Sequence, residues 1–350
     1  MKLKNLDLKV EEDKLTSLNK LLFQEDFKKR LDEIRKIKIT LTEQPILEGI
    51  DFASKDNFNG ILKKLEEKDK FTLDPKQGNE WAKSIVLSGY DESKLEFVTL
   101  EGLASFISHS LVTYAGEDLL PVTYLSFYFY SRSENLLINS KFFRPTSEPD
   151  VEEKRDYAKD RNNLIAQYAI SESLVCIDGP LIGGNLSSST IELVRKLESK
   201  NVVPIFIVKN SDSNLVTDNI SGLKHNFNSD LHWAYNLLNP GERTCMYLYE
   251  DAYNPINSKA FFYLKPFSGL SPQRIEFHNS TLNLHSDILP VIFDAIYYLF
   301  LAHGDPRNPQ VRPIAVAEKY AREVLRLINP YSFMKSTGII PTVNQTRFGA

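Results

Sequence analysis

The chain has 350 residues, 42% of them hydrophobic, which is ordinary for a globular protein with one large or two modest domains. Its net charge of −4 excludes a globally basic nucleic-acid-binding protein, so any contact with nucleic acid has to be local. Its two cysteines, Cys176 and Cys245, supply neither a zinc cluster nor a disulfide framework, and they fit the reducing cytoplasm.

The N-terminal part of the chain predicts helical structure. In residues 14–38, apolar side chains recur at roughly helical spacing between charges, which indicates an amphipathic helix or a helix pair. Residues 49–92 mix helical and loop signals, so we expect a helical N-terminal extension over residues 1–94. The first residues lack the apolar core of a signal peptide, and the best apolar stretch, residues 288–302, is short and interrupted. We therefore expect neither export nor a membrane span.

The next segments alternate between strand and helix signals. Segments rich in Val, Thr, Tyr and Phe, separated by glycine turns, predict three adjacent antiparallel strands. A helix, a strand, a second helix and another strand follow, and two strands and two helices end the domain. The three strands are expected within 94–102, 108–116 and 121–132, and the later elements at 150–169, 173–178, 189–199, 202–208, 261–267, 274–279, 286–303 and 313–329. We expect one domain over residues 95–330 and a loose tail over residues 331–350.

The most informative segment is SLVCIDGPLIGG, residues 173–184. Its apolar run lacks polar alternation, which is typical of a strand covered on both faces, and it stops at Asp178 before a Gly-Pro turn. Burying an unpaired carboxylate costs several kcal/mol, so Asp178 should face solvent, a cation or a hydrogen-bond donor. The alternative is that Asp178 only caps its own turn.

Three strands, a helix, a strand ending in aspartate, a helix and a strand form the element order of a ribonuclease-H-like core. We therefore expect an α/β fold with a mixed sheet flanked by helices. In that fold, carboxylates from different elements converge on one or two divalent ions that position a phosphodiester. The segment VTLEG supplies Glu101 near the end of the first expected core strand, although a surface glutamate at a turn would give the same pattern.

Over residues 95–327 the chain resembles the NurA nucleases, which act with the HerA ATPase in DNA end resection. The resemblance is carried by four pieces in order: LVCIDGPL with Asp178, PIFIVKNS with Lys209, the pair FFYLKPF and SPQRIEF with Lys265, Arg274 and Glu276, and PIAVAEKYAREVL after Gly304, Asp305 and Pro306. It implies a ribonuclease-H-like fold, a homodimer and a hexameric ATPase partner.

The resemblance also implies which residues form the site. Where the family has Asp-Gly-Ser, this chain has Glu101 followed by Gly102 and Leu103, at a comparable distance from Asp178. Asp51, in GIDFAS, is the competing candidate for this first acid. The family's helical glutamate corresponds to Asp160, with Asp156 one turn earlier as the alternative, and the family's histidine aligns with Glu318. Lys209 and Arg274 are the expected substrate-binding residues.

The four expected acids, Glu101, Asp160, Asp178 and Glu318, form an all-oxygen set that suits Mg²⁺ or Mn²⁺ rather than zinc. Clustered carboxylates repel one another without a cation, which predicts dependence on a metal. We expect a metal-dependent endo- or exonuclease that processes DNA ends with a HerA-like ATPase, in repair or in anti-phage defence. The chain has no Walker-type phosphate loop, so the motor has to be another protein. The alternatives are a catalytically weakened adaptor that docks the ATPase and holds DNA, and a hydrolase of small phosphoesters.

Overall fold

The computed structural model describes residues 29, 32–37, 56–57, 60–116, 118–133, 141–182, 186–220, 223–224, 226–251, 254–340 and 342. The chain divides into two units, Met1–Glu48 and Gly49–Ala350. In the first unit the described residues include a helical turn at 32–35, which lies inside the helix expected at 14–38. Residue 29 is also helical, whereas residues 36 and 37 are not, and the other residues of the expected helix lie outside the described residues.

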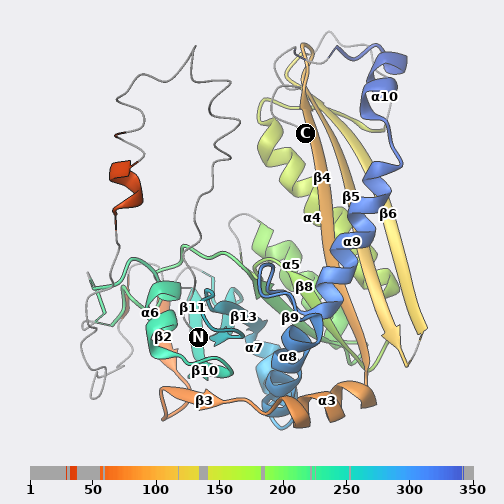
Figure 1. Cartoon of the computed structure of the whole chain (residues 1–350). Helices are drawn as coiled ribbons and strands as arrows, with labels where there is room; N and C mark the ends of the chain where they lie inside the picture. Colours follow the sequence, from red (N-terminus) through yellow and green to blue (C-terminus); the bar gives the residue numbers. More distant parts are fainter. Residues whose placement is uncertain are drawn as a thin grey trace. The chain divides into compact units, whose positions relative to one another are not determined.

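The second unit is built on one large mixed sheet (Figure 1). Its described strands are β1 (Asp56–Asn57), β2 (Gly60–Lys64), β3 (Lys70–Thr72), β4 (Val86–Val98), β5 (Leu103–Ala115), β6 (Asp118–Ser131), β7 (Phe143–Pro145), β8 (Ser173–Asp178), β9 (Val203–Val208), β10 (Glu242–Thr244), β11 (Tyr247–Asp251), β12 (Ser258–Lys265) and β13 (Gln273–His278). They lie in the order β1-β2-β11-β12-β13-β9-β8-β4-β5-β6-β7, and β10 pairs with β12 and β3. The pairs β4–β8, β8–β9 and β6–β7 are parallel.

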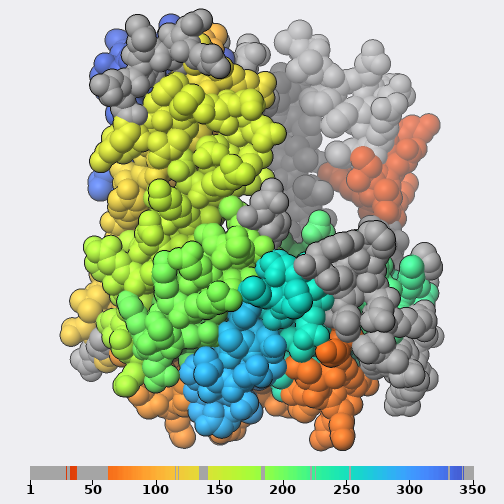
Figure 2. Space-filling model, turned by 180° about the vertical axis from the view of Figure 1, so that it is seen from behind, coloured from red at the N-terminus to blue at the C-terminus, as the bar shows by residue number. Residues whose placement is uncertain are grey.

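Helices cover both faces of this sheet. The described helices of this unit are α3 (Pro75–Ser84), α4 (Pro149–Tyr168), α5 (Ser187–Glu198), α6 (Asp230–Leu237), α7 (Asn279–His285), α8 (Leu289–His303), α9 (Arg312–Arg326) and α10 (Pro330–Thr337). In Figure 1, α9 crosses one face of β4 and β5, whereas α4 and α5 lie behind the sheet. Figure 2 shows that rear face from outside, with α4 in yellow-green above α5 in green and α7 in blue.

The central strand β8 explains why two helical layers are needed. Val175 and Ile177 pack with residues of α4 and α5, whereas Leu174 and Cys176 pack with residues of α8 and α9. Because successive side chains of a strand point to opposite faces, a strand covered on both sides is apolar throughout. Each such side chain contributes about 1.5–3 kcal/mol on burial, so the core fixes the position of the strand end at Asp178. Burial also raises the pKa of the Cys176 thiol to about 12, which leaves it unreactive.

The expected mixed sheet flanked by helices is confirmed, and β4, β5 and β6 are the three expected antiparallel strands. The first strand, however, begins at Val86 and runs through the boundary expected at residue 95. The preceding described segments supply β1 to β3 and α3 to this unit rather than forming only a helical extension. The polar run Asp91–Lys94 resembles a turn in sequence, but its backbone pairs with Ile107–Ser110 of β5 in an uninterrupted ladder.

The described part of the tail also packs on this unit. Met334 of α10 is fully buried in a cluster with Phe97 and Phe106, and the Leu100 N–H donates to the Ile340 carbonyl. Within the described residues, no single helix is long and apolar enough to cross a membrane. The pair α7 and α8 would pass by length and composition, but it is bent by 111°.

Candidate active site

Two acids meet where β4 and β8 lie side by side. The strands are parallel, and Tyr90 of β4 pairs with Ile177 of β8. The next residues are therefore Asp91 and Asp178, and both side chains point to the face covered by α9. Asp178 ends its strand because Gly179 follows with φ +97°, a left-handed conformation that favours glycine. The register between β4 and β8 thus brings two carboxylates together, one within β4 and one at the end of β8.

A third acid comes from α9. A Cβ atom on Gly89 would lie 2.2 Å from the carbonyl carbon of Pro313, so glycine lets the first turn of α9 touch the backbone of β4. Ile314 of α9 packs in the hydrophobic core with Leu174 and Cys176 of β8. Glu318 follows one helical turn later, on the same face of α9. This close contact brings the Glu318 carboxylate near Asp178, and its charge raises the pKa of Asp178.

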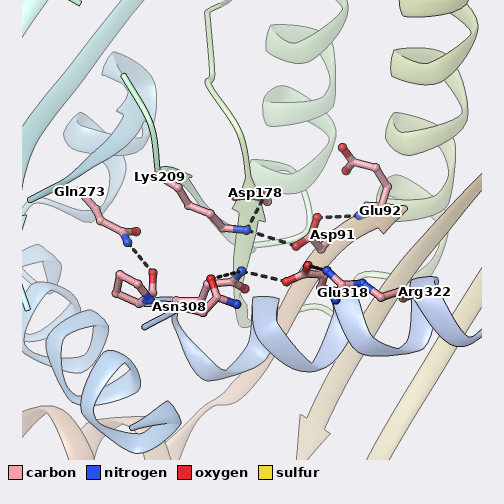
Figure 3. Close-up of polar contacts among 10 residues, drawn as sticks. Asp91, Glu92, Asp178, Lys209, Gln273, Asn308, Glu318 and Arg322 are labelled. Atoms are coloured by element: carbon pink, nitrogen blue, oxygen red, sulfur yellow. Dashed lines mark hydrogen bonds and ion pairs between the residues drawn. The ribbon is translucent and has the colours of Figure 1, made fainter. Parts of the chain in front are cut away.

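The ammonium group of Lys209 contacts both aspartates, Asp91 and Asp178 (Figure 3). Lys209 follows β9, the parallel neighbour of β8, and its Nζ lies 3.1 Å from Oδ2 of Asp178 and 3.5 Å from Oδ2 of Asp91. The second oxygen of Asp91 accepts the Glu92 N–H at 2.7 Å. Asp91 is only 4% exposed, whereas Asp178 and Lys209 are partly open to solvent. The site is therefore a carboxylate pair held at its open side by one cation.

Burial and mutual repulsion dominate the charge states of the pair. Burial, and then the charge of Asp178, raise the pKa of Asp91 to about 8, although Lys209 opposes the shift. Burial also raises the pKa of Asp178, and Lys209 partly offsets this. Burial lowers the pKa of Lys209, but the charges of Asp178 and Asp91 outweigh it and raise the pKa overall. Below about pH 8, Asp91 therefore keeps its proton, so two carboxylate charges do not have to share one lysine.

Glu318 is oriented by its own partners. Its Oε2 accepts from Nε2 of Gln310 at 2.8 Å, and its Oε1 binds Arg322, one turn further along α9. Gln310 also donates to Asn308 at 3.2 Å, and its own Oε1 is buried without a hydrogen-bond partner in the described part of the chain. The loop before α9 therefore holds Glu318 at the edge of the site (Figure 3).

A fourth acid, Glu92, lies beside the pair on the opposite face of β4. It contacts Tyr157 of α4, and its pKa is raised by burial and by the charge of Asp178, with Tyr157 and Arg161 opposing the shift. Together with Lys94 and Glu153, it lines a cavity of about 220 Å³ between β4 and α4. Glu92 thus adds negative charge behind Asp91.

The sequence did not indicate Asp91 and Glu92, although a signal was present. IVLSGYD is an apolar segment that ends in an aspartate, like LVCID before Asp178. Because the first core strand is expected from the sequence to begin near residue 95, the acid predicted near its end is Glu101.

The structure does not bring Glu101 to Asp178. Glu101 lies in the turn after β4, and its Oε2 accepts the Ile340 N–H at 3.2 Å. At about 3.3 Å per residue, this turn is more than about 20 Å along the chain from Asp91. The glycine that follows is explained by packing, because a Cβ on Gly102 would lie 2.0 Å from the Tyr130 carbonyl oxygen. The competing candidate Asp51 lies outside the described residues.

Asp160 and Asp156 also lie away from Asp178. Tyr128 donates to Asp160 at 2.8 Å, and Tyr130 donates to Asp156 at 3.2 Å, so both acids face β6. In the sheet, β6 is three strands from β8, about 14 Å at 4.8 Å per step, and α4 covers the face opposite to α9. Burial raises the pKa of Asp160. Asp156 also pairs with Arg144, whose Nε lies 2.9 Å from its Oδ2, so both acids have partners away from the site.

Of the two expected substrate-binding residues, Lys209 lies in the site and Arg274 does not contact it directly. Arg274 is 6% exposed and pairs with Glu276, whose carboxylate is fully buried. Its Nη1 donates to Ser211, two residues after Lys209.

The side chains fit a hard divalent ion by their chemistry. Asp91, Asp178 and Glu318 offer only oxygen ligands, which suit Mg²⁺ or Mn²⁺. In the arrangement observed, however, no three His, Cys, Asp or Glu side chains of the described residues are grouped closely enough to hold an ion. Lys209 stands between the two aspartates instead, so an ion would replace its ammonium there.

The strand order, the helices on both faces, and the acids within β4 and at the end of β8 define a ribonuclease-H-like protein. The sequence model of the NurA domain matches residues 100–323, which is most of the chain. The chain therefore belongs to the NurA family of nucleases, and the resemblance seen in the sequence is confirmed. The matched segment begins after β4, so Asp91 lies outside it.

A solved NurA structure agrees with this fold, and two further solved structures are reported with it. The NurA nuclease from Sulfolobus solfataricus matches with a TM-score of 0.51 at 10% identity, over 93% of this chain and 97% of that one. A NurA structure bound to dAMP and manganese matches with a TM-score of 0.39 at 10% identity, over 88% and 92%. Endonuclease V from Ciona intestinalis, in complex with DNA, matches with a TM-score of 0.36 at 11% identity, over 70% and 87%. No curated protein matches the sequence.

Proposed function

We propose that this nuclease is a metal-dependent deoxyribonuclease whose site is formed by Asp91, Asp178, Glu318 and Lys209. The observation that carries the proposal is the convergence of three carboxylates, from β4, β8 and α9, around one ammonium group. Such a cluster has no structural need, because burying like charges together destabilises the fold. Asp91 replaces Glu101 as the first acid of the expected set.

When bound, Mg²⁺ or Mn²⁺ would polarise the phosphodiester and lower the pKa of water. Asp91 and Asp178 would hold the ion from two neighbouring strands, and Glu318 would complete the ligand set after turning away from Gln310. Lys209, released from the aspartates, can donate a hydrogen bond to a phosphate oxygen. The three acids stand on strands or on a helix, which limits their movement, and Lys209 directly follows β9.

Glu92 takes the place that was expected for the helical acid Asp160. It is adjacent to Asp91 in sequence and interacts electrostatically with Asp178, whereas Asp160 is bonded to Tyr128. We infer that Glu92 strengthens the negative field of the site from the α4 side. It does so without contacting the reacting atoms, because its side chain leaves the opposite face of the strand.

Family membership supports the wider proposal that the protein is a homodimer working on DNA ends with a HerA-like hexameric ATPase. We propose this role in DNA repair or anti-phage defence, in the cytoplasm. The two buried cysteines are free, in agreement with a reducing compartment.

A second candidate is a weakened nuclease that acts as an adaptor for the ATPase. The observation that favours it is the position of Lys209, which occupies the space between the aspartates where an ion has to bind. A nuclease requires that an ion displace this lysine, whereas an adaptor does not.

Cleavage of linear DNA by the purified full chain distinguishes the two. The protein is incubated with end-labelled DNA in Mn²⁺, in Mg²⁺ and in a chelator, with and without a HerA-like ATPase. We expect products only with a metal. An inactive protein that still binds the ATPase and DNA would instead support the adaptor.

A further inference from the structure

Next to the site, β12, β13 and the start of α6 contribute four buried charged residues, Asp230, Lys259, Arg274 and Glu276, which we call the buried charge cluster. Each is at most 6% exposed, and Asp230 and Glu276 are fully buried. Oε1 of Glu276 lies 2.5 Å from Nζ of Lys259 and 2.7 Å from Nε of Arg274. Although burial raises the pKa of Glu276, the two cations lower it overall, so the carboxylate is ionised.

Stability alone does not explain such a cluster. The cost of removing charges from water often equals or exceeds their mutual attraction, and apolar residues of similar size are frequently as stable. The specific contacts of the cluster therefore indicate what else it does.

One contact reaches the segment that carries Asp178. The second oxygen of Glu276 accepts the backbone N–H of Leu181 at 2.8 Å. Leu181 is fully buried and follows Asp178 after the Gly179–Pro180 turn. Glu276 thus reaches past β9 and fixes the turn at the end of β8.

A second contact reaches the segment that carries Lys209. Arg274 pairs with Val208 at the end of β9, and its Nη1 donates to Oγ of Ser211 at 2.6 Å. Lys209 lies between these two points. The same ion pair therefore contacts the chain just after both parallel strands of the site.

We infer that Glu276 and Arg274 are positioning residues, which set the relative placement of Asp178 and Lys209 through Leu181 and Ser211. This inference rests on the proposed function. Displacing a catalytic group by about 1 Å can reduce a rate about 100-fold, so a rigid buried anchor for two site segments has a direct effect on the reaction.

Two double variants separate positioning from stability. Lys259→Met with Glu276→Leu removes one charge of each sign and the acceptor for Leu181. Lys259→Met with Glu276→Gln removes the same charges but keeps an acceptor oxygen. The second variant is the control matched in charge: Gln keeps an acceptor oxygen for the Leu181 N–H, whereas Leu removes every polar contact of this side chain, including the one with Nε of Arg274.

Three quantities are measured on each full-length protein: the Tm, the affinity for Mn²⁺ by calorimetry, and kcat and KM on linear DNA. We expect the Leu variant to lose about 10- to 100-fold in Mn²⁺ affinity and in kcat, the range for partners of metal ligands, with KM for DNA within about threefold. The Gln variant should remain within about threefold of wild type in each. Equal behaviour of two folded variants would overturn the inference.

The wild-type protein supplies a test that requires no variant to fold. The Leu181 amide should exchange with solvent deuterium slowly, on the timescale of the core strands, because its N–H is buried and bonded to Glu276. Exchange as fast as that of an exposed turn would contradict the anchoring. If the wild type neither binds Mn²⁺ nor cleaves DNA, the proposed function fails and this inference with it. If the wild type does both and the folded variants do not differ, only the inference fails.

Discussion

Asp91 of β4 and Asp178 of β8 bind the same ammonium group, at 3.5 and 3.1 Å from Nζ of Lys209. The two aspartates are far apart in sequence, and they meet because their strands are parallel neighbours with Tyr90 opposite Ile177. This pairing of β4 with β8 is the basis of the proposed site, and each prediction below tests a different part of it.

Asp91→Asn should abolish cleavage, whereas Glu101→Gln should leave it within a few fold of wild type. We expect the cleavage rate to fall at least about 100-fold for Asp91→Asn and for Asp178→Asn, because each variant removes a carboxylate charge that holds the ion, and the ion neutralises and positions the phosphodiester. Initial rates on linear DNA at saturating Mn²⁺ give the comparison. If Glu101→Gln strongly reduced cleavage while Asp91→Asn remained active, Glu101 and not Asp91 would be the first acid of the site.

Glu318→His should keep substantial metal-dependent activity, because an imidazole nitrogen can replace the carboxylate as a metal ligand. Glu318→Ala should lose at least about 10-fold in cleavage rate, because alanine offers no ligand atom. Arg322→Ala serves as the control. It removes the exposed partner of Glu318 while leaving the contact with Gln310, so its effect should be small. Undiminished cleavage by the Ala variant would make Glu318 an ordinary helix residue.

Stability of the metal-free protein should fall as the pH rises from about 4 to about 8. Asp91 holds its proton to about pH 8 when folded, mainly because of burial, whereas an unfolded aspartate releases it near pH 3.8. The folded state therefore binds more protons throughout this window, and stability decreases as the pH rises. Asp91→Asn removes this contribution, so its Tm should depend less steeply on pH. Parallel Tm profiles of the two proteins would contradict the raised pKa.

Gly89→Ala should destabilise the protein by about 1–3 kcal/mol or more, because the added methyl group meets the backbone of Pro313 and pushes α9 from β4. Activity should fall as well, since Glu318 moves with α9. Gly269→Ala is the control, where the added group meets no atom within 4 Å and only the φ of +76° is unfavourable, at about 1 kcal/mol. Urea unfolding measures both. If Gly89→Ala lowered the free energy of unfolding by less than Gly269→Ala does, α9 would tolerate displacement from β4, which contradicts the prediction.

The sequence predicted a site residue only where the residue's own segment carried the signal, without reference to its partners in the fold. Asp178 could be predicted because a strand covered on both faces is apolar throughout and its end is plain. Asp91 could not, because β4 continues through the polar run Asp91–Lys94, and only pairing with β5 makes that run a strand.

The helical acids show a second limit. Helical spacing put Asp156 and Asp160 on one face of α4, but it does not show which strand that face meets. That face meets Tyr128 and Tyr130, whose hydroxyls donate to the two carboxylates, and Asp156 also pairs with Arg144. Glu318 was found through the family resemblance alone, because the helical pattern of α9 does not distinguish a site acid from a solvated one.

Anomalous diffraction from crystals of the full chain soaked in Mn²⁺ tests the central claim most directly. The account predicts a manganese peak within about 2.0–2.6 Å of carboxylate oxygens of both Asp91 and Asp178, with Nζ of Lys209 displaced from its position between them. A peak at Glu101 or Asp160, or none between the two aspartates at saturating Mn²⁺, would contradict it.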